Sequence, residues 1–74
     1  MTLNWQLTWL PWCALWSAEA PAGRAEIYVL PQQVGLQLIF AGEGPAAPSG
    51  YYYTVDEAKR AAEILLARQA ERSA

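Results

Sequence analysis

Histidine is absent from this chain of 74 residues, and cysteine occurs only once, at Cys13. A lone thiol excludes an internal disulfide bond and a cysteine-based zinc site, and the missing imidazole removes the commonest metal ligand and general base. The sequence also lacks a nucleophile with a base beside it and a glycine-rich phosphate loop at a strand–helix junction. We therefore expect a chain that is not an enzyme and that has no metal, cofactor or small-molecule ligand.

Positive charge is scarce as well. Five Lys and Arg residues stand against seven Asp and Glu residues, and Arg24 is the one cation in the first 58 residues. Surfaces that bind nucleic acids usually cluster Lys and Arg, so we expect no nucleic-acid partner. A nucleic-acid-binding β-sheet domain is kept as the alternative, because aromatic side chains can stack on single strands.

Residues 1–18 carry no charged side chain, and Ala18-Glu19-Ala20 has the form of a signal-peptide cleavage site. No Lys or Arg precedes the apolar part, however, and Asn4, Gln6 and Thr8 interrupt it, which argues against a signal peptide. The run is also shorter than the about 20 apolar residues of a transmembrane helix. With its lone cysteine, the chain is predicted to be cytoplasmic and to have no membrane partner.

Alternation of apolar and polar residues predicts strands over the first half of the chain. In the first, Leu3 and Trp5 lie on one side and Asn4 and Gln6 on the other; in the second, Trp12 shares a face with Trp16. Short turn-forming connections favour an antiparallel meander. The expected strands are 3–10, 12–20, 24–30 and 34–41. Residues 42–50 are predicted to form a loop, and a short edge strand at 51–53 is left open.

The most clearly marked element is a helix over about residues 55–72. Thr54-Val55-Asp56-Glu57 has the S/T-x-x-E form of a capping box. An apolar stripe follows at helical spacing, and polar residues lie mostly opposite to it. The stripe consists of Val55, Ala58, Ala61, Ala62, Leu65 and Leu66; the opposite set is Lys59, Arg60, Glu63, Ala67 and Glu71. We predict one α+β domain over 1–74: a three- to four-stranded antiparallel meander with one C-terminal amphipathic helix packed on one face.

These motifs occur in an order that resembles small bacterial and prophage proteins of unknown function, in which a β-meander precedes a helix opening S/T-x-x-E-A-K-x-x-A. The matching stretches are Leu3–Trp5, Trp16–Val29 and Tyr53–Glu63, and the departures are 11–13 and the proline-rich segment 45–48. The resemblance implies the fold and a bacterial or phage source, and it brings no activity or functional residues with it.

The sheet face that the helix leaves open carries the functional prediction. Such a face should be polar in a monomer, yet the alternation places Leu15, Tyr28, Leu30 and Ile39 on it. Exposed apolar patches mark interfaces, and Trp and Tyr are enriched at binding hot spots. We predict that these four residues form an interface and that the chain is a small interaction module, either a homodimer or bound to a protein partner. The competing interpretation is that segment 42–50 or the first strand covers this face.

Overall fold

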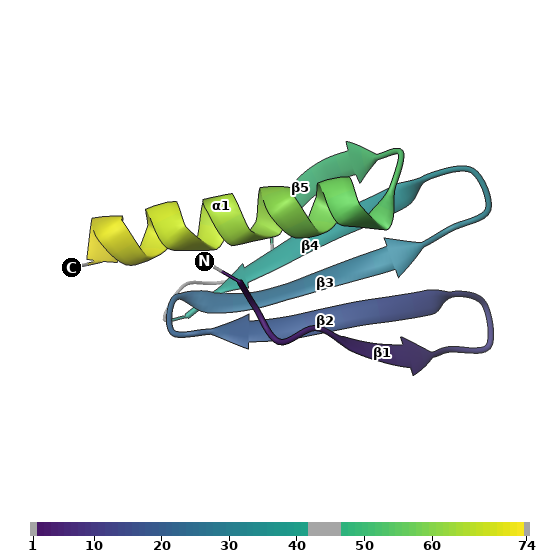
Figure 1. Ribbon diagram of the computed structural model, residues 1–74, viewed down its shortest axis with the longest axis horizontal. Helices are drawn as coiled ribbons and strands as arrows, with labels where there is room; N and C mark the ends of the chain where they lie inside the picture. Colours follow the sequence, from purple (N-terminus) through teal and green to yellow (C-terminus); the bar gives the residue numbers. More distant parts are fainter. Residues whose placement is uncertain (1, 42–46, 74) are drawn as a thin grey trace.

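The computed structural model describes residues 2–41 and 47–73. Each strand pairs antiparallel with the next, so the sheet has the order β1-β2-β3-β4-β5, and α1 lies across one of its faces (Figure 1). The α+β class is confirmed, but the sheet has five strands instead of three to four. The elements are β1 Gln6–Trp9, β2 Ala14–Ala20, β3 Gly23–Val29, β4 Val34–Phe40, β5 Ala47–Tyr52 and α1 Val55–Ser73.

The fifth strand corrects the prediction of a loop over 42–50. Residues 47–50 belong to β5, whereas residues 42–46 lie outside the described residues. Proline and glycine are tolerated here because β5 is an edge strand, where one side of the backbone has no ladder partner. The pairing with β4 shifts between Leu36 and Gln37, and Gly50 takes a φ of +122°, so the ladder accommodates the irregular residues.

The first two strands are shorter than predicted. Residues 2–5 leave the sheet, because the Leu3 N–H donates to Glu63 Oε2 over 3.0 Å and Trp5 Nε1 donates to the same oxygen over 3.2 Å. At the far end of β1, the Leu10 N–H donates to the Cys13 carbonyl over 2.9 Å. This turn moves the start of the second strand from residue 12 to Ala14.

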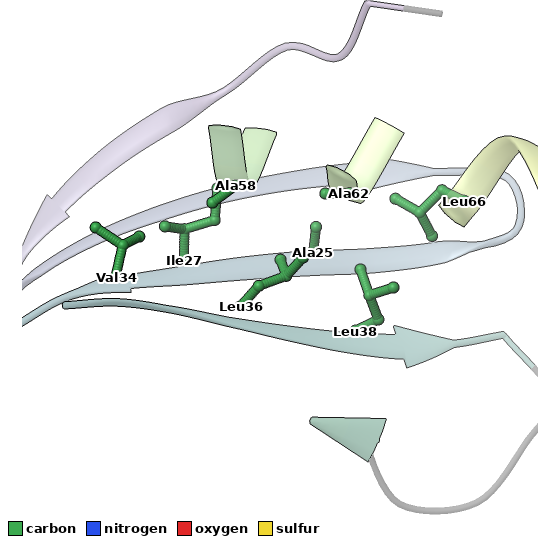
Figure 2. Close-up of a cluster of buried hydrophobic side chains, with 8 residues drawn as sticks. All are labelled: Ala25, Ile27, Val34, Leu36, Leu38, Ala58, Ala62 and Leu66. Carbon is green, nitrogen blue, oxygen red and sulfur yellow. The ribbon is translucent and has the colours of Figure 1, made fainter. Parts of the chain in front are cut away.

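The core lies between α1 and the middle of the sheet. Ala58, Ala62 and Leu66 are fully buried, and Figure 2 shows them in a row facing side chains of β3 and β4. Two alanines at the contact let the helix backbone approach the sheet closely, and the predicted buried stripe of the helix is confirmed. The sheet contributes Ala25, Ile27, Val34, Leu36 and Leu38 to this cluster.

Two helix residues predicted to lie opposite the stripe contact tryptophans instead. Lys59 Nζ lies 3.7 Å from the centroid of the Trp16 ring and 5.8 Å from that of Trp5. Glu63, one turn further on, accepts the two hydrogen bonds from the segment before β1. A long cationic side chain can bury its stem and place its charge over a ring. Lys59 and Glu63, at the polar border of the stripe, therefore hold the N-terminal segment against the helix. The prediction that these two residues lie opposite the stripe was wrong.

The predicted N-cap is present and gives a local test. The Glu57 N–H donates to Thr54 Oγ1 over 3.1 Å, and the Thr54 hydroxyl donates to Glu57 Oε1 over 3.2 Å. We expect Thr54→Ala to lower the free energy of unfolding by about 1 kcal/mol in urea denaturation, and Thr54→Ser, which keeps the oxygen, to change it by only a few tenths. Equal losses in the two variants would contradict a role for the hydroxyl.

Candidate functional site

The sheet face opposite α1 has an apolar end and a polar end. Ile27 and Leu36 are buried beneath the helix, so their strand neighbours point to the open face. The register gives three rows across this face. The first consists of Thr8, Leu15, Tyr28, Gly35 and Tyr51; the second contains Ser17, Glu26 and Gln37; the third contains Glu19, Arg24 and Ile39. Apolar side chains therefore gather in the first row, and charges in the other two.

All four residues predicted to form the interface are half-buried. Leu15 and Tyr28 are direct cross-strand partners, and Leu30 follows on the same face just after β3. Ile39 lies opposite Arg24 at the polar end, about 13 Å along the strand from the first row at about 3.3 Å per residue. The structure thus brings three of the four together and leaves Ile39 apart.

A hollow of about 390 Å³ lies at the apolar end. Gly35 forms part of its floor between the rings of Tyr28 and Tyr51, and a Cβ at this glycine would stand 3.5 Å from the Tyr51 ring. Trp12 and Tyr51 are 73% and 69% exposed, so two large rings border the hollow with most of their surface in contact with solvent. Cys13 and Leu30 also contribute to the lining.

Sequence reasoning missed Trp12, Gly35 and Tyr51. It placed Trp12 on the face of Trp16 by alternation, but Trp12 precedes β2 in a turn, where alternation does not apply. The signal at Gly35 was that this glycine pairs with a tyrosine on each neighbouring strand, Tyr28 on β3 and Tyr51 on β5. That arrangement becomes visible only when the register of three strands is known.

Charged residues surround Arg24 at the polar end of the face. Glu26 Oε1 accepts a hydrogen bond from the Tyr28 hydroxyl over 3.3 Å, and its Oε2 lies 3.4 Å from Arg24 Nε. Arg24 Nη1 also pairs with Glu19 over 3.1 Å. Two carboxylates therefore hold one guanidinium, and this part of the face carries a net negative charge.

The Tyr28 phenol should titrate late. Burial and the neighbouring Glu26 carboxylate, which also accepts its hydrogen bond, raise the pKa of Tyr28 above its ordinary value of 10.0, while Arg24 acts in the opposite direction. A raised pKa in the folded state contributes stability that is fully present below pH 10 and is lost as the pH rises through the folded value.

We therefore expect a phenol that ionises later than free tyrosine in an alkaline absorbance titration, and we expect Tyr28→Phe to remove that step. If the phenol that disappears from the titration curve in Tyr28→Phe is instead one that ionises like free tyrosine, the late step does not belong to Tyr28.

Other sites are less suited to binding. A depression of about 450 Å³ follows the outer side of α1, but all of its lining comes from that one helix, so it has no opposing wall. In the part of the chain that the structure describes, no group of three or more His, Cys, Asp or Glu side chains could hold a metal ion. Over the same residues, no helix has both the length and the apolar character of a membrane span.

Comparisons with known proteins found no matching family model, no matching curated protein and no matching solved structure. The resemblance to small bacterial and prophage proteins stays a prediction.

Proposed function

We propose that this chain is a non-enzymatic interaction module that binds a segment of a protein partner in the hollow between Trp12, Tyr28 and Tyr51. The exposure of Trp12 and Tyr51 around a glycine floor carries the proposal. Large apolar side chains that stay exposed together mark interaction sites, and Trp and Tyr are the residues most often found at binding hot spots.

The lining of the hollow favours an extended, proline-containing segment. Proline-rich segments adopt a preformed polyproline II helix, and they dock in grooves lined by aromatic rings. The rings of Trp12, Tyr28 and Tyr51 supply such walls. The volume of about 390 Å³ is at the small end of ligand sites, which range over about 300–1,000 Å³. It would accommodate a few side chains of a partner.

Charge adds a second requirement for the partner. Glu26 lies about 7 Å along β3 from Tyr28, and Glu19 is exposed further along, at the polar end of the face. Together with Arg24 they give the polar part of the face one excess negative charge. A Lys or Arg next to the docked segment would be complementary to this charge, which would fix its orientation and speed its association.

Pairing of two whole open faces, the homodimer foreseen from the sequence, is less well supported than a docked segment. β2, β3 and β4 are each 7 residues long, so the face measures about 23 Å by about 19 Å. Two copies would bring about 900 Å² of flat area together. Most of the contact would be polar, since two of the three rows on this face carry mainly polar or charged side chains.

Nucleic-acid binding has less support still. It needs cations that are free to meet phosphates, and Arg24 is held by Glu19 and Glu26. We also place the protein in the cytoplasm, because the single thiol of Cys13 fits a reducing compartment.

The proposal is tested by selecting random short peptides from a display library on the immobilised protein. We expect enriched sequences that combine proline with a Lys or Arg. Tyr51→Ala should weaken their binding about tenfold or more, the effect of losing a hot-spot side chain. Tyr53→Ala is the matched control, since Tyr53 is 91% exposed and lies outside the hollow. Failure to enrich peptides, or equal losses in both variants, would contradict the proposal.

A further inference from the structure

The β1 edge is the unprotected edge of the sheet. Natural edge strands avoid pairing with other chains by means of charged residues, proline or bulges. β5 has Pro48 and a register shift. β1 has none of these devices, and all four of its residues are exposed. Residues 1–18 contain no charged side chain that would repel a neighbouring strand.

The hydrogen bonds of the hairpin show which backbone groups of β1 point outward. The Leu10 N–H donates to the Cys13 carbonyl, so these two residues form a hydrogen-bonded pair. Such pairs alternate with non-hydrogen-bonded pairs along an antiparallel ladder. Thr8 and Gln6 therefore direct their backbone groups to β2, whereas Leu7 and Trp9 direct their N–H and C=O groups to the open edge.

The same two residues expose apolar side chains next to that edge. Leu7 pairs with Trp16, which places it on the helix side of the sheet. The helix packs on β3, β4 and β5 and does not reach β1 (Figure 1). Leu7 and Trp9 are therefore 41% and 76% exposed.

We propose that the β1 edges of two copies of this chain pair antiparallel, with the two-fold axis at Thr8. Leu7 of each copy then forms a hydrogen-bonded pair with Trp9 of the partner subunit, and each of these two pairs exchanges two backbone hydrogen bonds. The outward groups also select this register. If Leu7 instead lay opposite Leu7 of the partner subunit, Trp9 would lie opposite residue 5 of the partner subunit, which has left the sheet. A second copy of the chain is a suitable partner because the outward N–H and C=O groups of its β1 have the same two-residue spacing. Its β1 edge is also uncharged, so the two edges do not repel each other.

Side-chain contacts favour the same register. Leu7 and the partner's Trp9 would lie side by side on the helix face, and Thr8 would face the partner's Thr8 on the open face, both favourable cross-strand pairs. The joined sheet would have twice five strands. The two-fold axis stands perpendicular to it, so both hollows face the same side. A partner with two docking segments could then bind both at once, with a gain in avidity.

The size of the contact sets the expected strength. One short strand and two side chains per copy bury less than about 1,200 Å², the range of weak and transient complexes. We expect dimerisation in the micromolar range, measured by sedimentation velocity from about 1 μM to about 1 mM. Wild-type protein should shift from its 8.2 kDa monomer mass towards twice that value. Trp9→Lys should stay monomeric, because it places a charge at the edge.

Trp12→Lys is the matched control, since Trp12 is as exposed as Trp9 but belongs to the hollow. It should dimerise like the wild type. A monomer at every concentration would overturn the proposal, and so would a dimer that Trp12→Lys abolishes and Trp9→Lys does not.

Amide hydrogen exchange gives a second measurement that needs no substitution. The amides of Leu7 and Trp9 should become protected as the concentration rises, whereas those of Thr8 and Leu10, already bonded within the hairpin, should change little. A dimer that leaves the Leu7 and Trp9 amides unprotected would also overturn edge pairing.

Discussion

Replacing Ile27 by alanine is expected to lower the free energy of unfolding by about 2–5 kcal/mol, the usual loss for truncating a fully buried isoleucine. Ile27 is 0% exposed and lies in the cluster that joins β3 and β4 to α1 (Figure 2). Typical stabilities of about 0.05–0.15 kcal/mol per residue give about 4–11 kcal/mol for a chain of this length. The substitution should therefore remove a large part of the total stability.

Ile64→Ala is the matched control for this prediction. Ile64 is 53% exposed on the outer side of α1, and alanine favours helix formation, so we expect a change within about 0.5 kcal/mol. Both variants can be compared by urea denaturation followed by tryptophan fluorescence. Similar losses at the two isoleucines would show that the buried face of the helix or of the sheet is wrongly identified.

Replacing Ala62 by leucine should cost about 1–3 kcal/mol, because the added atoms overpack a closed contact. Ala62 is 0% exposed and lies in the core cluster between α1 and the sheet. Ala70→Leu makes the same change at an exposed position of the same helix and should be nearly neutral.

Thermal unfolding measures the difference between these two variants, since a domain of this size shifts by about 4–8 °C per kcal/mol. An Ala62→Leu protein as stable as Ala70→Leu would mean that space exists between the helix and the sheet, and the close approach through alanine would be refuted.

The parts of the fold that follow local rules could be predicted from the sequence. The helix start depends on Thr54 and Glu57, which are three residues apart, and its buried face follows from the spacing of Ala58, Ala62 and Leu66. β3 and β4 were predicted nearly to the residue, because their period-2 pattern is bounded by short turns.

The errors fall where distant residues decide the structure. Leu3 and Trp5 continue the strand pattern, but Glu63 on the helix binds them and withdraws them from the sheet. Residues 47–50 have loop composition, but the free edge of β4 recruits them as a strand. In both cases a tertiary partner overrides the local preference.

The candidate site was only partly predictable for the same reason. Leu15, Tyr28 and Leu30 were placed on the open face by alternation alone, and the register confirms that they lie together. Trp12 comes from a turn, and Tyr51 comes from β5, of which the sequence left open only a short edge strand at 51–53. Their convergence on the hollow depends on the pairing of β2 to β5.

The binding role of the hollow is tested most directly by amide chemical-shift mapping of the labelled protein during titration with a library-selected peptide. The largest shifts should occur at Gly35 and Tyr51, with further shifts at Tyr28 and at the Trp12 indole N–H. The amide of Tyr53 should remain unchanged. Shifts confined to α1 or to the β1 edge, with the hollow unaffected, would contradict the proposed function.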